Sequence, residues 1–500
     1  MGDLRAFPTI LTTSDSVTLF WEKHMEASPS WSYRLLADGM VELSGTKTHF
    51  TLHNLHPGKQ VDLTLQVFIG DSIWHTMWQG VCQTRPVRRK IDISRPPYSA
   101  VGDGKTLNTT ALQKALDACG QDDMVYFPAG VYLTGALTIH SNTEIYLEKN
   151  AILQGTSEAG DYLPKIPSRF EGIESMCYSS LLNLGTLNHQ SGPNCENVLI
   201  HGKGTIASGG QILARHIIED ERRVLAEYLH ENQSLVATCE NNDTIPGRVR
   251  PRLVNMSNCK NLRISGLTLK NGASWNVHMI YSSHITTDHC TFVSEGVWNG
   301  DGWDPDSSEN CAIFACRFFT GDDAVAVKSG KNPEGNLIAR PSRHILIFDC
   351  NSAFGHGICI GSEMSGGIEK VHIWDCNLAN SYSGIEIKGT QKRGGYVRDI
   401  FVQDCITPRV MIHSVPYNDD GIPAPAIPVF TQFRFDRITL TGLLLDHDYR
   451  YNECTAIEIC GFDPPGHEVR DVRFIDCLSQ ENTSIRIQKC QEISIDLKQI

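Results

Sequence analysis

Short alternating strands recur along most of this chain, and this recurrence constrains its fold more than any other feature. Runs of about three to six residues, such as VYLTGALTIH and VHIWDCNLAN, return about every twenty to thirty residues. One coil of this kind leaves its apolar edges exposed and buries them only against its neighbours. A β-propeller would add hairpin turns and a longer four-stranded repeat. We therefore predict an all-β fold whose main body is a right-handed parallel β-helix.

Two segments interrupt the strand pattern with helical spacing. Residues 109–119 place apolar side chains at helical intervals behind an Asn/Thr start. We expect one helix there, which caps the first coil and shields its edge strands from other chains. Residues 211–232 carry a second helical pattern, which we expect to form an excursion beside the cleft.

The first part of the chain has a different strand pattern. Residues 1–88 hold short alternating strands separated by turn residues, which predicts a small β-sandwich with Trp21 in its core. With its HNLHPGKQVDLTL stretch, this segment resembles a fibronectin type III module, a resemblance that implies a spacer role. A basic, proline-containing segment at residues 89–96 predicts a linker, and residues 97–500 form the predicted β-helix domain.

The charge of the chain limits its partners. A formal net charge of −13 and a pI near 5.8 provide no basic footprint for nucleic acid or an anionic membrane. A polyanionic substrate therefore needs a local cationic patch. The N-terminal residues do not combine basic residues with an apolar run. We expect a cytoplasmic protein, or a secreted one if a leader was removed.

The cysteines predict buried free thiols rather than disulfides or metal ligands. Their number, 17, is odd, their spacing is wide, and many lie in strand-like runs. Four of them follow an aspartate, in FDC, WDC, QDC and IDC, a recurrence that indicates a structural role. The sequence has no C-x-x-C pair and no Cys/His cluster. We therefore predict no metal site and no cofactor.

Acids and glycines concentrate in three stretches about one coil apart: WNGDGWDPDSSEN, TGDDAVAVKSG and GHGICIGSE, with GIEIKGT after them. If the repeat places equivalent residues above one another, Asp301, Asp322, Asp323, His356 and Lys388 form a patch on one face. Each stretch alone is ordinary turn material. Four of them in order are hard to produce by turn chemistry, so the patch is a candidate site.

Three clustered aspartates fit the hydrolysis of a glycosidic bond. Inversion needs one carboxylic acid to protonate the leaving oxygen and a second carboxylate about 6.5–9.5 Å away to activate water. Crowded like charges raise one pKa and keep a proton available, while His356 and Lys388 moderate the field. We expect Asp304 and Asp306 to shape the turn, with Asp304 supporting the acids. His278 and Trp275 are expected as wall or core residues.

With these motifs in order, together with GDGKT, YFPAGVYLTG and RPRLVNMSNCKNLRISGLTLKN, residues 97–490 resemble the polygalacturonase family of glycoside hydrolases, and its bacterial exo-acting branch in particular. The resemblance implies that Asp322 is the general acid and that Asp301 and Asp323 activate the water. It also implies that His356 supports the acids by hydrogen bonding and that Lys388 binds substrate. No metal or organic cofactor belongs to that mechanism.

The chain departs from the family pattern at two places. Asn299-Gly300-Asp301 replaces Asn-Thr-Asp, which keeps Asn299 as a polar substrate-binding candidate. Glu386 replaces an arginine, on the same strand face as Lys388. Glu386 either forms a surface ion pair with a nearby lysine or accepts hydroxyls of a neutral sugar such as rhamnose. Arg393 or Arg252 would then supply the missing cation.

The predicted function is an inverting, exo-acting hydrolase of α-1,4-galacturonosyl linkages in pectic oligosaccharides. The alternative, based on Glu386, is a rhamnogalacturonan-type hydrolase. A pectate lyase would need bound calcium and an arginine base, for which the sequence offers no obvious cage. A β-helix that binds carbohydrate without turnover is the remaining alternative. The predicted partner is a pectic oligosaccharide, with no nucleic acid and no membrane, and the oligomeric state is left open.

Overall fold

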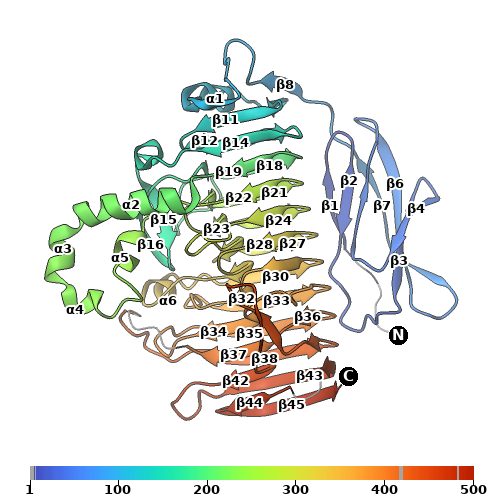
Figure 1. The fold of residues 1–500 in the computed structure, drawn as a ribbon. Coiled ribbons are helices and arrows are strands. Elements are labelled where there is room, and N and C mark those ends of the chain that lie inside the picture. Colours follow the sequence, from blue (N-terminus) through green and yellow to red (C-terminus); the bar gives the residue numbers. More distant parts are fainter. Residues whose placement is uncertain (1–4, 6, 416–420, 481–482, 500) are drawn as a thin grey trace. The chain divides into compact units, whose positions relative to one another are not determined.

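The computed structural model describes residues 5, 7–415, 421–480 and 483–499 (Figure 1). The chain divides into two compact units, Met1–Arg89 and Lys90–Ile500. Among the described residues, no helix is long and apolar enough to cross a membrane.

The first unit is the predicted β-sandwich. Trp21 is only 2% exposed, and its ring contacts Tyr33 at 5.2 Å and Phe50 at 5.6 Å, residues that belong to opposite sheets. The resemblance to a fibronectin type III module stays a prediction. The antiparallel strands are β1 (Thr9–Thr12), β2 (Val17–Phe20) and β5 (His49–Leu52) in one sheet, and β4 (Met40–Gly45), β3 (Ser32–Ala37), β6 (Gln60–Phe68) and β7 (Trp74–Gln83) in the other.

The second unit is the predicted right-handed parallel β-helix, with three parallel sheets that each gain a strand as the chain completes successive coils. Sheet I contains β8 (Arg89–Asp92), β10 (Asp123–Phe127), β13 (Glu144–Leu147), β18 (Cys195–Gly202), β21 (Cys259–Ser265), β24 (Ser283–Asp288), β27 (Glu309–Phe314), β30 (Ser342–Phe348), β33 (Ile368–Trp374), β35 (Tyr396–Gln403), β36 (Ile406–Thr407), β38 (Val429–Asp436), β39 (Thr439–Leu440), β43 (Val469–Ser479) and β45 (Cys490–Gln499).

Sheet II carries the candidate site. It contains β12 (Leu137–Ile139), β17 (Leu182–Leu184), β20 (Val254–Ser257), β23 (Val277–Ile280), β26 (Trp303–Asp306), β29 (Val325–Val327), β32 (Gly357–Ile360), β34 (Gly384–Gly389), β37 (Val410–Ser414), β42 (Ile457–Cys460) and β44 (Ile485–Gln488). Sheet III contains β9 (Asp103–Leu107), β11 (Gly130–Thr134), β14 (Ala151–Gly155), β19 (Thr205–Ala207), β22 (Thr268–Lys270), β25 (Thr291–Val293), β28 (Arg317–Phe319) and β31 (Asn351–Phe354).

The recurring Asp-Cys pairs sit at turns between strands. The aspartate of each pair has a positive φ, between 48° and 55°, at Asp349, Asp375, Asp404 and Asp476. Aspartate tolerates this left-handed conformation better than most residues. The following cysteine is buried in each case, and all 17 cysteines are free thiols, as predicted.

The predicted helix at 109–119 is confirmed as α1 (Thr109–Asp117), whose buried Leu112, Ala115 and Leu116 join the β-helix core. The single helix expected at 211–232 is wrong in detail, because the chain breaks at Leu225 into α2 (Gly210–Val224) and α3 (Ala226–Glu231). The excursion continues as α4 (Gln233–Val236) and α5 (Thr244–Gly247).

The predicted linker at residues 89–96 also needs correction. Its first residues form β8, which pairs with β10 at the end of sheet I, so this segment belongs in part to the β-helix. The unpaired edge of the first coil provides the hydrogen-bonding partners that turn this segment into a strand. Further elements outside the three sheets are the hairpin β15 (Ile166–Phe170) and β16 (Ile173–Cys177), the 3-10 helix η1 (Ala159–Tyr162) and α6 (Glu334–Ile338).

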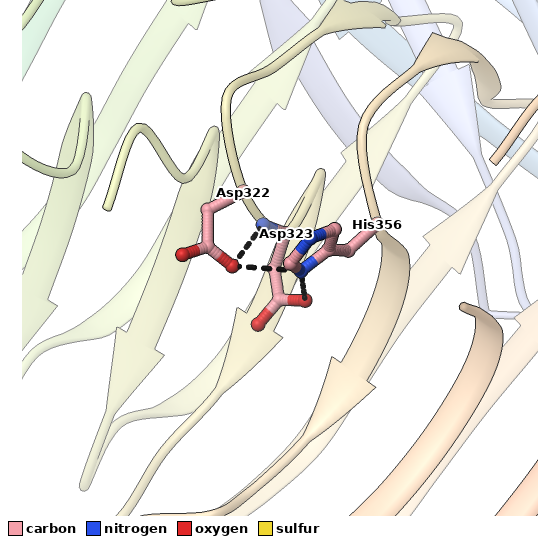
Figure 2. Close-up of side chains that lie close together, drawn as sticks. All are labelled: Asp322, Asp323 and His356. Atoms are coloured by element: carbon pink, nitrogen blue, oxygen red, sulfur yellow. Dashed lines mark hydrogen bonds and ion pairs between the residues drawn. The ribbon is translucent and has the colours of Figure 1, made fainter. Parts of the chain in front are cut away.

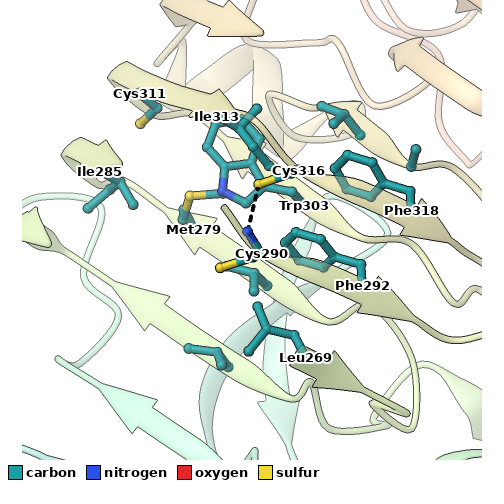
Figure 3. Packing of buried hydrophobic residues seen from close by; sticks show 14 of the residues in the cluster. Leu269, Met279, Ile285, Cys290, Phe292, Trp303, Cys311, Ile313, Cys316 and Phe318 are labelled. Atoms are coloured by element: carbon teal, nitrogen blue, oxygen red, sulfur yellow. Dashed lines mark hydrogen bonds between the residues drawn. The ribbon is translucent and has the colours of Figure 1, made fainter. Parts of the chain in front are cut away.

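Stacked side chains fill the interior of the coils (Figure 3). The rings of Phe292 and Phe318 lie 4.8 Å apart and nearly parallel, on paired strands β25 and β28. Trp303 is fully buried and donates from its indole nitrogen to Thr287 Oγ1 at 3.0 Å. Equivalent positions on successive coils therefore pack directly on one another.

Replacing Phe318 by Ala should lower the free energy of unfolding of the second unit by about 3–5 kcal/mol, because a fully buried ring leaves a cavity between coils. Chemical unfolding followed by circular dichroism measures this. Leu337→Ala is the control, since Leu337 is 83% exposed and its loss should change stability little. Equal effects of the two substitutions would contradict the described packing.

Candidate active site

The candidate site lies where successive coils enter sheet II. Asp301, Asp323 and His356 each stand two residues before a residue of β26, β29 or β32, and these strand residues pair in register. Because the pairing is parallel, equal offsets place the three side chains next to one another along the sheet. Asp322 directly precedes Asp323, and Lys388 lies on the next strand, β34. The structure thus brings together all five residues of the predicted patch.

His356 and the two adjacent aspartates form the centre of the site (Figure 2). His356 Nδ1 lies 2.9 Å from Asp322 Oδ1 and 3.7 Å from Asp323 Oδ1. The Asp323 backbone N–H also donates to Asp322 Oδ1 at 3.0 Å. These contacts fix the Asp322 carboxylate from two sides.

The three aspartates differ in their access to solvent. The side chain of Asp322 is 24% exposed, against 3% for Asp301 and 6% for Asp323. Asp322 is therefore the carboxylate that a molecule approaching this face would meet first.

The proton of the central pair resides on the histidine in this arrangement. Burial alone would lower the pKa of His356, but the charge of Asp322 and hydrogen bonds to both aspartates raise it well above the ordinary value of 6.5. Burial would likewise raise the pKa of Asp322, but the charge and hydrogen bond of His356, together with Lys388 and Lys328, lower it. The pair acts as one titrating unit that carries one proton.

Asp301 occupies a less polar position than Asp322. Burial and the charge of Asp322 raise the pKa of Asp301 well above its ordinary value of 3.8, with Lys328 offsetting part of this shift. Among the described residues, Asp301 Oδ1 has no hydrogen-bond partner. Two neighbouring carboxyls whose pKa values move in opposite directions are the arrangement that acid–base chemistry needs.

The sequence prediction missed a buried cation beneath the acids. Lys328 Nζ lies 3.5 Å from Asp301 Oδ2, 3.5 Å from Glu363 Oε2 and 4.6 Å from the Trp275 ring centre. Lys328 and Glu363 both occur in the acidic stretches of the sequence. The alternation of strand β29 carried on past its end was the available signal that Lys328 points toward the acids.

Asn299 is oriented by a second missed residue, Arg250. Arg250 is fully buried, stacks on Trp298 at 4.1 Å and donates to Asn299 Oδ1 at 2.7 Å. Burial lowers the pKa of Arg250 to about 9. With its oxygen held, the Asn299 amide nitrogen faces Asp322 Oδ2 at 3.5 Å. Asn299 therefore presents a donor beside the most exposed carboxylate.

Glu386 is paired, but not at the surface. It is buried, with Lys388 3.2 Å from one carboxylate oxygen and His413 2.8 Å from the other. Burial would raise the pKa of Glu386, but Lys388 and His413 lower it to about 2. Lys388 Nζ also lies 4.0 Å from Asp323 Oδ2. The predicted ion pair exists, then, as a buried one that holds Lys388 against the acids.

The two arginines proposed as replacement cations do not reach the acids. Arg393 is 2% exposed and donates to Ser362 O at 2.9 Å and to Asn332 Oδ1 at 2.8 Å. Arg252 is 1% exposed, donates to backbone carbonyls and stacks on Trp275 at 4.7 Å. Both are buried in supporting layers, so their assignment as cations facing the substrate needs correction.

The supporting acids behave differently from one another. Asp306 accepts from Arg169 at 2.8 Å and faces His278 at 3.3 Å, both fully buried, while burial lowers the pKa of His278 to about 4. Asp304 is also fully buried, and burial together with Asp301 raises its pKa well above the ordinary value. Asp304 thus lies next to the candidate acids, as expected, and Asp306 anchors strand β15 through Arg169.

Two groups of side chains offer ligand atoms close enough together for a metal ion, one formed by Asp322, Asp323 and His356 and one by Asp323, Cys359 and Glu386. A metal would need a neutral histidine, whereas the pKa of His356 is raised. Lys388 already supplies a positive charge between Asp323 and Glu386. The charges of the site favour carboxylates balanced by the chain's own cations.

The model of glycosyl hydrolases family 28 matches residues 127–413, more than half of the chain. The chain belongs to this family. It is 33% identical over 319 residues to a probable polygalacturonase of Vitis vinifera, covering 61% of this chain and 58% of that one. It is 28% identical over 398 residues to an exo-poly-α-D-galacturonosidase of Dickeya chrysanthemi, covering 76% of this chain and 65% of that one. The chain thus spans less than two thirds of the length of either relative.

Solved structures support the fold. The family 28 exopolygalacturonase of Yersinia enterocolitica matches with a TM-score of 0.82 at 20% identity, covering 99% of this chain and 95% of that one. The polygalacturonase of Erwinia carotovora ssp. carotovora matches with a TM-score of 0.55 at 21% identity, covering 80% of this chain and 95% of that one.

Replacing Arg169 by Met should lower the free energy of unfolding by about 3–5 kcal/mol, because it leaves the Asp306 carboxylate buried without its cation. Urea unfolding measures the change. The double variant Arg169→Met/Asp306→Asn removes both charges and should recover part of the loss. A single variant as stable as the parent would contradict the buried ion pair.

Proposed function

We propose that this protein hydrolyses α-1,4-galacturonosyl linkages of pectic oligosaccharides, with inversion at the anomeric carbon and release of single terminal sugars. The observation that carries the proposal is the gathering of Asp301, Asp322, Asp323 and His356 from consecutive coils around one proton-carrying pair. Membership of glycosyl hydrolases family 28 and the printed activities of the relatives support it.

Asp322 is proposed as the general acid. It is the most exposed of the three aspartates, and its proton source, His356 Nδ1, lies 2.9 Å away. The carboxylate of a bound galacturonate adds negative charge beside Asp322 and thereby raises its pKa. The proton then passes from His356 to Asp322 and on to the leaving glycosidic oxygen. Asn299 would donate to Asp322 Oδ2 or to the sugar.

Asp301 and Asp323 are proposed to activate the attacking water. Both are nearly buried, which leaves room for a small molecule rather than a sugar ring between them and the groove. One carboxylate accepts a proton from the water as its oxygen attacks the anomeric carbon. Lys328 beside Asp301 and Lys388 beside Asp323 keep the two carboxylates ionised during this step.

Lys388 is proposed as the cation that binds the substrate carboxylate. Its side chain is 14% exposed, and Glu386 and Asp323 hold it in place. Because both Glu386 oxygens are engaged by Lys388 and His413, Glu386 supports Lys388 rather than accepting sugar hydroxyls. This pairing favours a galacturonan substrate over the rhamnogalacturonan alternative. Exo action is supported by the Dickeya chrysanthemi relative.

Chromatography of products from oligogalacturonides and from rhamnogalacturonan oligomers, offered separately, tests the proposal. The expected result is release of single galacturonate units from the first substrate from the earliest times. Fragments of mixed length would contradict exo action, and turnover of the second substrate alone would favour the alternative. Unsaturated products lost on adding a chelator would identify a lyase, and binding without turnover would identify a binding module.

In the same assay, Asp322→Asn should lower kcat by about 10²- to 10⁴-fold, since it removes the proposed proton donor at constant shape. Asp122→Asn is the matched control, because Asp122 is an exposed aspartate far from the acid stretches in the sequence. An Asp322→Asn variant as active as this control would contradict the assignment of the general acid.

The pH dependence of kcat/KM should be bell-shaped, with both limbs displaced upward. The acid limb should lie above 3.8, because burial and Asp322 raise the pKa of Asp301, which must be ionised to accept a proton. The alkaline limb should lie above 6.5, because the proton delivered to the substrate is held by the pair in which the pKa of His356 is raised.

His356→Gln provides the check on this profile. Without the imidazole, Asp322 alone holds the proton, so the alkaline limb should move to lower pH while the acid limb stays near its place. An unchanged alkaline limb in this variant would assign it to another group.

A further inference from the structure

A hairpin far along the chain reaches back to the candidate active site. Its strands are β40 (Leu443–Leu445) and β41 (Tyr451–Glu453), which pair antiparallel outside the three sheets. Residues 443–453 are called the strap here. Nothing in the sequence pattern marked this segment as part of the site.

The strap is tied to earlier coils at several points. The Leu445 backbone N–H donates to Ser381 O at 3.3 Å, and the Tyr451 hydroxyl donates to Asn380 Oδ1 at 2.8 Å. The Tyr449 ring stacks on Phe354 at 4.6 Å, two residues before His356. Its hydroxyl donates to Glu295. These contacts hold the tip of the strap beside the turn that carries His356.

His447 at the tip of the strap meets the outer nitrogen of His356. The two Nε2 atoms are 3.3 Å apart, and the rings cross at 64° with their centres 5.4 Å apart. Since Nδ1 of His356 already faces Asp322, both nitrogens of this imidazole have partners. A protonated His356 donates from Nδ1–H to Asp322 and from Nε2–H to His447. His447 must then be neutral, with its own proton on Nδ1.

We propose that His447 is a positioning residue for the acid pair: it accepts a hydrogen bond from protonated His356 and keeps the other N–H of that ring directed at Asp322. This inference rests on the proposed function. An acceptor on Nε2 favours the charged imidazolium and fixes its orientation, as partners of the second ring nitrogen do for other functional histidines. His447 touches neither the aspartates nor the reacting atoms.

The surroundings of His447 are consistent with a neutral acceptor. The Tyr382 ring stacks on it at 5.8 Å, and the Phe354 ring lies edge-on at 6.0 Å. The charged groups around it are His356, Arg409 over the Tyr382 ring, Glu295 beneath Tyr449, and Asp446, Asp448 and Arg450 of the strap. Asp446 is itself occupied by the backbone of the turn, accepting from the Asp448 and Arg450 N–H groups.

Three variants of the full chain test this. His447→Leu removes the acceptor, His447→Gln retains an amide oxygen that can accept from His356, and Tyr451→Phe removes one strap anchor without touching either histidine. We expect His447→Leu to lower kcat about tenfold with little change in KM, because solvent can replace the acceptor only in part. Its alkaline limb should move to lower pH. His447→Gln and Tyr451→Phe should stay near the parent.

Equal losses in His447→Leu and His447→Gln would overturn the inference, as would a rise in KM alone, which would make His447 a sugar-binding residue. If the parent protein turns over no pectic oligosaccharide, the proposed function fails separately. NMR titration of the imidazole signals then decides: a lower titration midpoint for His356 in His447→Leu than in the parent supports the inference, and an unchanged midpoint overturns it.

Discussion

The in-register parallel pairing of successive coils is the constraint on which the rest of the structure depends. It converts distance along the chain into position along a sheet, so residues at the same offset from a strand become neighbours. Asp301, Asp323 and His356 stand at equal offsets before β26, β29 and β32 and therefore meet. The acids depend on a backbone ladder rather than on a mobile loop, and this keeps their mutual geometry fixed.

The same stacking crowds negative charge, and the fold answers with buried cations. Lys328 lies between Asp301 and Glu363, Lys388 between Asp323 and Glu386, and His356 against Asp322. Burying a carboxylate without such partners would simply neutralise it. Because the cations are placed unequally, the pKa of Asp301 rises while that of Asp322 falls. Two chemically identical side chains thereby acquire different acid strengths.

The sequence was informative wherever local pattern fixes position. Strand alternation and the coil repeat predicted the β-helix, and their spacing placed Asp301, Asp322, Asp323, His356 and Lys388 on one face. The break at Leu225 and the strand β8 were missed, because they depend on packing and on a free sheet edge. Arg393 and Arg252 were wrongly placed, since the sequence does not show which side of a turn a long side chain takes. His447 was invisible because it lies 91 residues from His356 along the chain.

The central claim is that these aspartates direct a water molecule onto the anomeric carbon in a single displacement. Proton NMR of the first sugar released from an α-linked oligogalacturonide, recorded before mutarotation, tests it most directly. The account predicts the β-anomer, the inverted product. Initial appearance of the α-anomer would require a covalent intermediate and would contradict the roles assigned to Asp301 and Asp323.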